Sequence, residues 1–311
     1  MQLNQKTVKH KSVKRSNFRL SIVFHIILII LAIIWLYPVV WMILTAFREE
    51  YNQSGQLIGL VSGNYLPKSY GLENFTRLFN GSPNSAQYAS GWFPRWFLNT
   101  LIVSIFTFII STIFTLSVAY VMSKMKFRGR KTILNLAMIL GLFPGFMSII
   151  AVYHILQVFE LLNSYAGSML ALILCYSGGA GLGFYVGKGF FDVIPDSLIE
   201  SARLDGATNL QVFTKIVLPL SKPIIVYTAL TSFMGPWTDF IFARAILGAQ
   251  YQERFTVSVG LYSMAYGQFS DANLFTIFIA GCLLISVPIV ALFLSMQKYY
   301  VSGVTSGAVK G

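Results

Sequence analysis

Residues 20–46 read LSIVFHIILIILAIIWLYPVVWMILTA, a run of 27 residues that contains no lysine, arginine, aspartate or glutamate. About 20 apolar residues are enough for a helix to cross the hydrocarbon core of a bilayer. The run has no small-residue cleavage site, so we expect a retained span and not a signal peptide. Because a backbone in lipid must satisfy its own hydrogen bonds, the run predicts a transmembrane helix.

Five further apolar blocks repeat this pattern along the chain, while charged residues make up only 11% of it. An ordinary soluble domain carries roughly 25% charged residues. We therefore predict an all-α, polytopic membrane protein with about six transmembrane helices. The predicted spans are Leu20–Ala46, Trp96–Ser123, Thr132–Val152, Ala166–Gly187, Pro223–Leu247 and Leu274–Met296. Pro144 interrupts the third span, so we expect its outer half either to be kinked or to lie along the membrane interface.

The lysines and arginines predict the orientation of the chain. Seventeen of the 23 lie on the side of the N-terminus and five on the other. Such an excess marks the cytoplasmic side, so both termini are expected there. The predicted organisation is a basic cytoplasmic N-tail at residues 1–19, a transmembrane domain at 20–299 and a cytoplasmic C-tail at 300–311. The transmembrane domain includes an outer loop at 47–95 and a cytoplasmic loop at 191–222.

Charge and motif content argue against several other function classes. The net charge is +12, but the basic residues lie in short stretches between apolar blocks, which disfavours nucleic-acid binding. Cys175 and Cys282 lack a paired spacing, so no disulfide framework or metal site is predicted. No GxxxxGK[ST] string is present, so the chain is not expected to hydrolyse ATP by that route.

The predicted cytoplasmic loop has strong local signals for two short helices, with the sequence FDVIPDSLIESARLDGATNLQVFTKIVLPLSK. Pro195 suits a helix start, and Gly206 suits a left-handed helix end. Thr208 and Gln211 have the spacing of a capping box for the second helix. That helix is expected to stop before Pro219, because a residue preceding proline avoids the α region. From these signals alone, a loop that packs on its own bundle and a loop that binds a partner remain equally open.

The string ESARLDGA at residues 200–207, followed by IVLP at 216–219, resembles the EAA signature of ABC importer permeases. Ser201 replaces the first alanine of that signature and is nearly as small. The strings GLFPGF, GPWTDF, FTVSVGL and SGAVKG are similar to the second permease subunit of maltodextrin-type sugar importers; they occupy residues 141–146, 235–240, 255–261 and 306–311.

This resemblance implies the type I ABC importer permease fold and a role in ATP-driven import of an oligosaccharide such as a maltodextrin, in the cytoplasmic membrane of a prokaryote. The implied partners are a homologous permease subunit, two ATPase subunits that bind ATP and Mg²⁺, an extracytoplasmic sugar-binding protein and membrane lipid. The loop 248–272 and the outer loop would meet the sugar-binding protein. The chain itself would hold no cofactor.

The resemblance also implies which residues contact the ATPase. The loop 191–222 would form a coupling helix docked on it, with the matching positions Glu200, Ser201, Ala202, Asp205, Gly206, Leu218 and Pro219. The C-tail would reach the same interface through Gly307 and Lys310.

Trp237 and Asp239 place polar and aromatic groups within the fifth span. A carboxylate at that depth is costly, so Asp239 should face the bundle interior or water. One interpretation makes both residues part of a translocation path; the other makes Asp239 a hydrogen-bond hub between helices and Trp237 a packing residue. An ion-driven secondary transporter would need intramembrane acids and is the main alternative function. A membrane enzyme is disfavoured, since the spans show no nucleophile–base arrangement.

Overall fold

The computed structural model describes residues 13–53, 57–59, 65–81, 88, 90–142, 145–179, 183–266 and 274–308. These residues are mostly helical and contain no strand beyond two isolated bridges, which confirms the all-α prediction. The longer helices are α1 (Val13–Ala46), α2 (Glu73–Asn80), α3 (Trp92–Lys124), α4 (Arg130–Gly141), α5 (Gly145–Val158), α6 (Tyr165–Gly179), α7 (Phe184–Asp192), α8 (Asp196–Leu204), α11 (Lys222–Thr238), α12 (Ile241–Leu247), α13 (Val257–Ala265) and α14 (Leu274–Ala308).

Three helices in the described part of the chain, α1, α3 and α14, are long and apolar enough to cross a bilayer without a break. A fourth candidate is bent by 88° between residues 209–220 and 222–238. The predicted third, fourth and fifth spans each contain two helices: α4 with α5, α6 with α7, and α11 with α12. Six continuous spans are therefore not confirmed, and the number of crossings stays a prediction.

The break between α11 and α12 follows from local chemistry. Pro236 lies near the end of α11 and has no N–H to donate, and the helix ends two residues later at Thr238. Asp239 is extended, with ψ of 123°, and its carboxylate accepts hydrogen bonds from the N–H groups of Phe242 and Ala243. The chain thus starts α12 at once with capped N–H groups.

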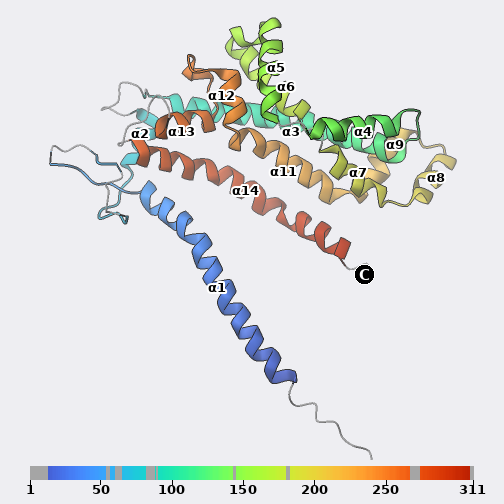
Figure 1. The fold of residues 1–311 in the computed structure, drawn as a ribbon, viewed down its shortest axis with the longest axis horizontal. Helices are drawn as coiled ribbons and strands as arrows, with labels where there is room; N and C mark the ends of the chain where they lie inside the picture. Colours follow the sequence, from blue (N-terminus) through green and yellow to red (C-terminus); the bar gives the residue numbers. More distant parts are fainter. Residues whose placement is uncertain are drawn as a thin grey trace, which may run out of the picture.

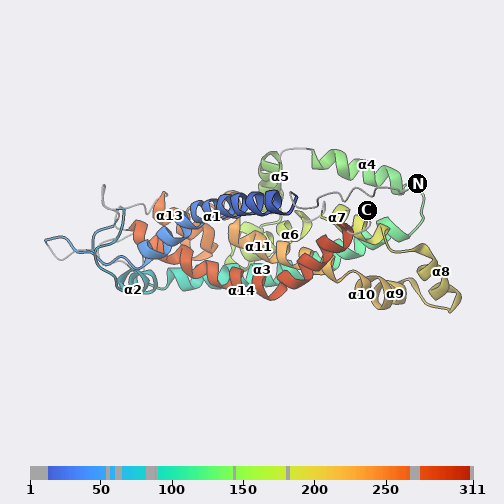
Figure 2. The same cartoon turned by 90° about the horizontal axis from the view of Figure 1, so that it is seen from below.

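Helix α3 lies at the centre of the bundle, packed against α6, α7 and α11. Helices α2 and α13 lie at one end of the bundle, and α8 lies at the other (Figure 1). Helix α1 runs away from the bundle in the same view, and α4 stands apart from α3 when the molecule is seen from below (Figure 2). The central helix α3 therefore runs between the two ends of the bundle.

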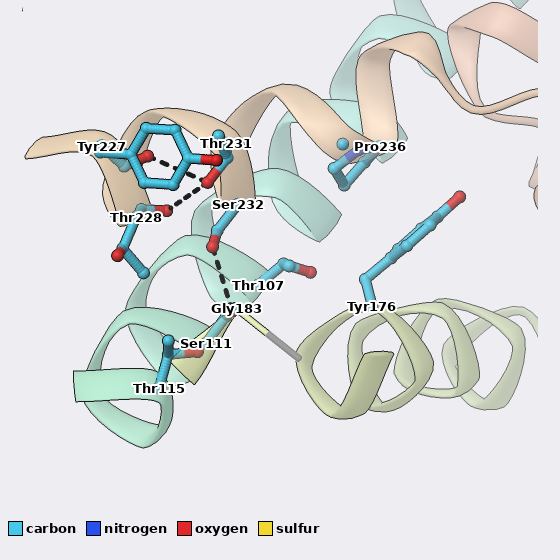
Figure 3. A pocket seen from close by; sticks show the side chains of 11 residues that line it. Thr107, Ser111, Thr115, Tyr176, Gly183, Tyr227, Thr228, Thr231, Ser232 and Pro236 are labelled. Atoms are coloured by element: carbon cyan, nitrogen blue, oxygen red, sulfur yellow. Dashed lines mark hydrogen bonds between the residues drawn. The ribbon is translucent and has the colours of Figure 1, made fainter. Parts of the chain in front are cut away.

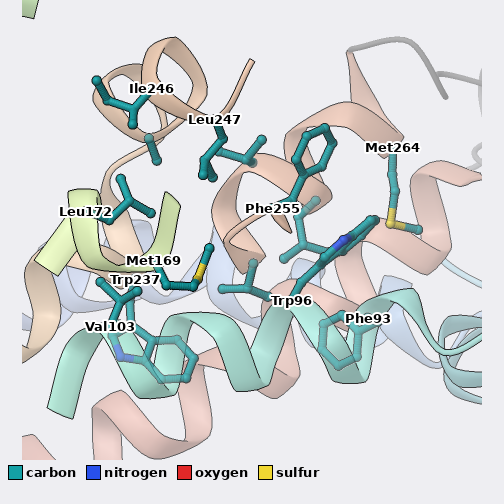
Figure 4. Close-up of a cluster of buried hydrophobic side chains, with 14 of the residues drawn as sticks. Phe93, Trp96, Val103, Met169, Leu172, Trp237, Ile246, Leu247, Phe255 and Met264 are labelled. Carbon is teal, nitrogen blue, oxygen red and sulfur yellow. The ribbon is translucent and has the colours of Figure 1, made fainter. Parts of the chain in front are cut away.

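Large buried aromatic side chains join α3 to the segments that follow α12. Trp96 is fully buried near Phe255 and Met264 (Figure 4). Its indole Nε1 donates to the carbonyl of Gln252 at 2.8 Å. Asn99, one turn further along α3, donates from Nδ2 to the carbonyls of Glu253 and Phe255, each at 2.9 Å. This cluster holds the segment 252–257 firmly on α3.

Candidate functional site

The loop 191–222 forms two short helical segments joined by a glycine turn, as predicted. Helix α8 starts directly after Pro195, and Asp196 lies in its first turn. Gly206 has φ of +84°, so it occupies the left-handed region that favours glycine. The N–H of Ala207 returns to the carbonyl of Ala202 at 2.9 Å, which closes the helix end. The predicted helix start and the predicted glycine turn are both confirmed.

The second segment starts with the predicted capping box and ends later than predicted. Thr208 Oγ1 accepts from the N–H of Gln211 at 3.3 Å, and Gln211 Oε1 accepts from the N–H of Thr208 at 2.8 Å. The chain then passes through α9 (Asn209–Val212), the π-helical segment η3 (Phe213–Val217) and α10 (Leu218–Leu220).

The expected stop before Pro219 is wrong, because the helical path continues to Leu220. In the π-helical segment the N–H of Leu218 reaches back five residues to the carbonyl of Phe213. This wider turn relieves the clash between the ring of Pro219 and the carbonyl four residues before it. A proline at this position is thus accommodated by a change of helix type.

The apolar surface of the two segments is divided between two faces. Ile199, Val212 and Val217 are buried in a cluster with residues of α3 and α7. Leu204 and Leu210, in contrast, are 89% and 69% exposed. The loop therefore packs on its own bundle through one face and still presents two large apolar side chains on the other.

The residues that match the EAA signature lie mostly on the surface. Glu200, Ser201, Asp205, Gly206 and Pro219 are exposed, while Ala202 and Leu218 are half-buried. In the C-terminal region, Gly307 lies within the backbone of α14, whereas Lys310 lies outside the described residues. The EAA positions share one end of the bundle, where they are free to meet another protein.

A contact that the sequence reasoning missed ties the loop to the end of α3. Lys124 Nζ donates to Asp196 Oδ1 at 2.8 Å and to the carbonyl of Ile194 at 2.6 Å. Next to it, Ser123 Oγ donates to Asp192 Oδ1 at 2.6 Å. The hydrogen bond and charge of Lys124 lower the pKa of Asp196, which is thus ionised at neutral pH. Lys124 is one of the basic residues that predict the orientation of the chain, and nothing in the sequence pairs it with a residue 72 positions away.

These contacts border an open depression of about 880 Å³ between the end of α3 and the loop 191–222. Its walls carry charges of both signs, including Lys126, Arg130, Glu200 and Arg203. Such a concave, charged surface beside the EAA positions offers ion pairs to a docked partner.

The contacts of Asp239 and Trp237 are those of residues with a structural role. Besides capping α12, Asp239 Oδ2 accepts from the hydroxyl of Tyr176 on α6 at 2.6 Å. Trp237 is 2% exposed and packs edge-on against Phe97, with ring centroids 5.1 Å apart. These contacts favour the hub and packing interpretation of both residues, and their role in a translocation path stays a prediction.

An open cavity of about 230 Å³ lies between α3, α6 and α11 (Figure 3), and its lining includes Tyr176, the hydrogen-bond partner of Asp239. Thr107, Ser111 and Thr115 of α3 line it, opposite Thr228 and Ser232 of α11. Sequence reasoning missed this cavity, although the four-residue spacing of the three α3 hydroxyls could have indicated it.

A protein-family model described as "Binding-protein-dependent transport system inner membrane component" matches residues 113–306, which include the loop 191–222 and the cavity-lining part of α11. The chain belongs to this family. Among its curated relatives, the galactooligosaccharides transport system permease protein GanQ of Bacillus subtilis (strain 168) is 34% identical over 288 residues, covering 92% of this chain and 94% of GanQ. The maltodextrin transport system permease protein MalD of Streptococcus pneumoniae (strain ATCC BAA-255 / R6) is 33% identical over the same shares of both chains.

A solved structure has the same fold as this permease. It is a chain of a bacterial ABC transporter involved in the import of the acidic polysaccharide alginate, with 22% identity and a TM-score of 0.74. The match covers 94% of this permease and 100% of that chain. The predicted ABC importer permease fold and the resemblance to sugar permeases are thus confirmed.

Proposed function

We propose that this chain is the permease subunit of an ATP-driven oligosaccharide importer and that it couples to the ATPase through the loop 191–222. The observation that carries this proposal is the outward face of that loop. Leu204 and Leu210 remain exposed although the same segments bury Ile199 and Val212 on the bundle. Exposed large apolar side chains next to the exposed Glu200 and Asp205 are typical of a protein interface.

The proposed assembly contains a homologous permease, two ATPase subunits and an extracytoplasmic sugar-binding protein. ATP and Mg²⁺ would be bound by the ATPase subunits, so this chain would be no enzyme itself. Its termini would be cytoplasmic, as the excess of basic residues on that side indicates. The C-tail, through Gly307 and Lys310, would add to the ATPase contact. The names of GanQ and MalD, which are galactooligosaccharide and maltodextrin permeases, support an oligosaccharide as the substrate.

An ion-driven secondary transporter has no specific observation in its favour. That mechanism needs an intramembrane acid that can bind a coupling ion, and Asp239 is the acidic residue within the predicted spans. Its carboxylate already accepts from two backbone N–H groups and the hydroxyl of Tyr176. These bonds leave it little capacity to hold an ion.

The assembly is tested by purifying the chain with an N-terminal tag from its own membranes in a mild detergent and identifying what accompanies it by mass spectrometry. We expect a second permease and an ATPase in near-equal amounts. A chain that arrives alone, from a preparation that keeps other ABC complexes intact, would contradict the proposal.

The docking face is tested by Leu204→Asp with Leu210→Asp. Because both side chains are exposed, the double variant should fold and insert normally, yet it should lose most of the ATPase subunit in the same purification. Val193→Asp is the matched control, since Val193 is 73% exposed and precedes α8. Equal ATPase recovery with the double variant and the control would exclude this face as the docking site.

A further inference from the structure

The cavity between α3, α6 and α11 has a lining of hydroxyl groups that the packing of the bundle does not account for. Thr107, Ser111 and Thr115 follow one another at four-residue intervals on α3, so they form a single stripe along the helix. All three are buried, with at most 2% of each residue exposed. The stripe therefore faces the cavity wall and not the surrounding lipid.

Two of these hydroxyls have no hydrogen-bond partner within the chain. Ser111 Oγ accepts from Ser232 Oγ of α11 at 3.0 Å, but Oγ1 of Thr107 and of Thr115 are buried without a partner. A buried hydroxyl without a partner is costly, so such groups normally bind water or a ligand. Figure 3 shows Thr107 pointing into the space that Tyr176 and Pro236 border.

The chemistry of the lining selects a class of ligand. None of the described residues that line the cavity carries a charge, and the polar side chains are hydroxyls of serine, threonine and tyrosine. Hydroxyls both donate and accept hydrogen bonds, as the hydroxyls of a sugar do. A carboxylate or phosphate placed there would be desolvated without a cationic partner, at a high cost in free energy.

The size of the cavity limits what it can hold. Its volume of about 230 Å³ lies below the roughly 300–1,000 Å³ of pockets for drug-sized ligands. It therefore suits one ring of an oligosaccharide more than the whole molecule. Thr231 and Tyr227 line it and are exposed, so the cavity opens to the surface of the chain.

We propose that this cavity is a sugar-binding subsite on this permease, selective for one ring of an uncharged oligosaccharide and built on Thr107, Ser111 and Thr115 of α3 and Ser232 of α11. This inference rests on the proposed import function and specifies the substrate as neutral. It also assigns direct sugar contact to this chain through residues other than Trp237 and Asp239.

The test uses the complete transporter reconstituted in vesicles, with labelled maltotriose and β-1,4-galactotriose as neutral probes and trigalacturonate as a charged one. Thr107→Val with Thr115→Val keeps the size of both side chains and removes both hydroxyls. We expect the KM for uptake of the transported neutral probe to rise about thirtyfold, which corresponds to about 2 kcal/mol for the two lost hydrogen bonds. Thr107→Ser with Thr115→Ser should restore the KM.

Thr112→Val is the matched control. Thr112 lies on the same helix and its Oγ1 is also buried without a partner, but it does not line the cavity. Its KM should equal that of the wild type. An unchanged KM in the double valine variant, or an equal rise in the control, would overturn the subsite while leaving the import function standing. Failure of the wild type to take up either neutral probe, with uptake of trigalacturonate instead, would overturn the neutral-sugar assignment.

A second measurement does not depend on transport. Thr231→Cys, in a complex whose own Cys175 and Cys282 are replaced by alanine, places a thiol at the exposed edge of the cavity. The transported neutral trisaccharide should slow its alkylation by N-ethylmaleimide, and trigalacturonate should not. Equal labelling rates with and without the neutral sugar would contradict binding at this cavity.

Discussion

Helices α1 and α3 are nearly equal in length and apolar character, yet they occupy opposite environments. They have 34 and 33 residues, and both are apolar enough to span a bilayer. In the most apolar 18-residue window, 0% of α1 is buried within the chain, against 33% of α3. The buried face of α3 carries polar side chains: Asn99, Thr100, Ser104, Thr107, Ser111, Thr115 and Ser123.

This difference shows that hydrophobicity does not select the interior of a membrane protein. Lipid is as apolar as leucine, so aliphatic side chains gain little by turning inward, whereas small and hydroxylated side chains allow close packing and hydrogen bonds between helices. The most apolar part of α1 has no buried polar stripe and runs away from the bundle, and only the C-terminal end of the helix packs on α14. The polar stripe, more than the apolar content, identifies α3 as the central helix.

The largest expected difference in stability is between alanine variants of two tryptophans, one on each helix. Trp96→Ala on α3 removes a fully buried side chain and its hydrogen bond to Gln252. It should destabilise the protein by about 3–5 kcal/mol. Trp35→Ala on α1, where the side chain is 77% exposed, should change stability by less than about 0.5 kcal/mol. Thermal unfolding in detergent measures both, and similar shifts for the two variants would break the comparison.

A smaller effect is expected for Asn99→Ala on α3. The side chain bonds the carbonyls of Glu253 and Phe255 and accepts from the hydroxyl of Tyr165. Its loss leaves buried polar groups without partners, which should cost about 1–3 kcal/mol. The same unfolding assay checks this, with Gln157→Ala as the control, because Gln157 is exposed and its side chain donates to the hydroxyl of Tyr153 on the same helix. Equal unfolding temperatures for the two variants would show that the α3 stripe contributes nothing specific.

The smallest effect on stability is expected at the far end of α3, where Lys124→Met breaks the bonds to Asp196 and Ile194. Asp196 is 72% exposed at its side chain and is screened by solvent, so the loss of stability should be the smallest of the three. The variant should impair coupling to the ATPase more than it lowers stability, because it removes the contact of Lys124 with the start of α8. We expect a clear fall in the stimulation of ATPase activity by sugar-loaded binding protein. Stimulation should stay normal in Arg128→Met, because Arg128 is exposed and does not line the charged depression. Full stimulation in Lys124→Met would show that this link does not transmit motion.

The local signals in the loop 191–222 allowed accurate prediction because their causes are local. Gly206 takes a positive φ because only glycine does so without strain, and Thr208 and Gln211 bond each other across three residues. The stop predicted at Pro219 failed because a π-helical turn, which no local sequence signal indicates, made room for the ring. Trp237 and Asp239 could be located in the fifth span, but their neighbours could not.

The sequence by itself determined that this protein is helical and resides in a membrane. It also determined where the turn and caps of the loop 191–222 lie and which family the chain resembles. These properties depend on composition or on residues a few positions apart. Only the tertiary structure decided that Lys124 meets Asp196, that Trp237 is buried and that Thr107 and Thr115 face a cavity shared with α11. Those facts depend on helices that meet in space although they are far apart in the chain, and helical periodicity says which residues share a face but not which helix that face will meet.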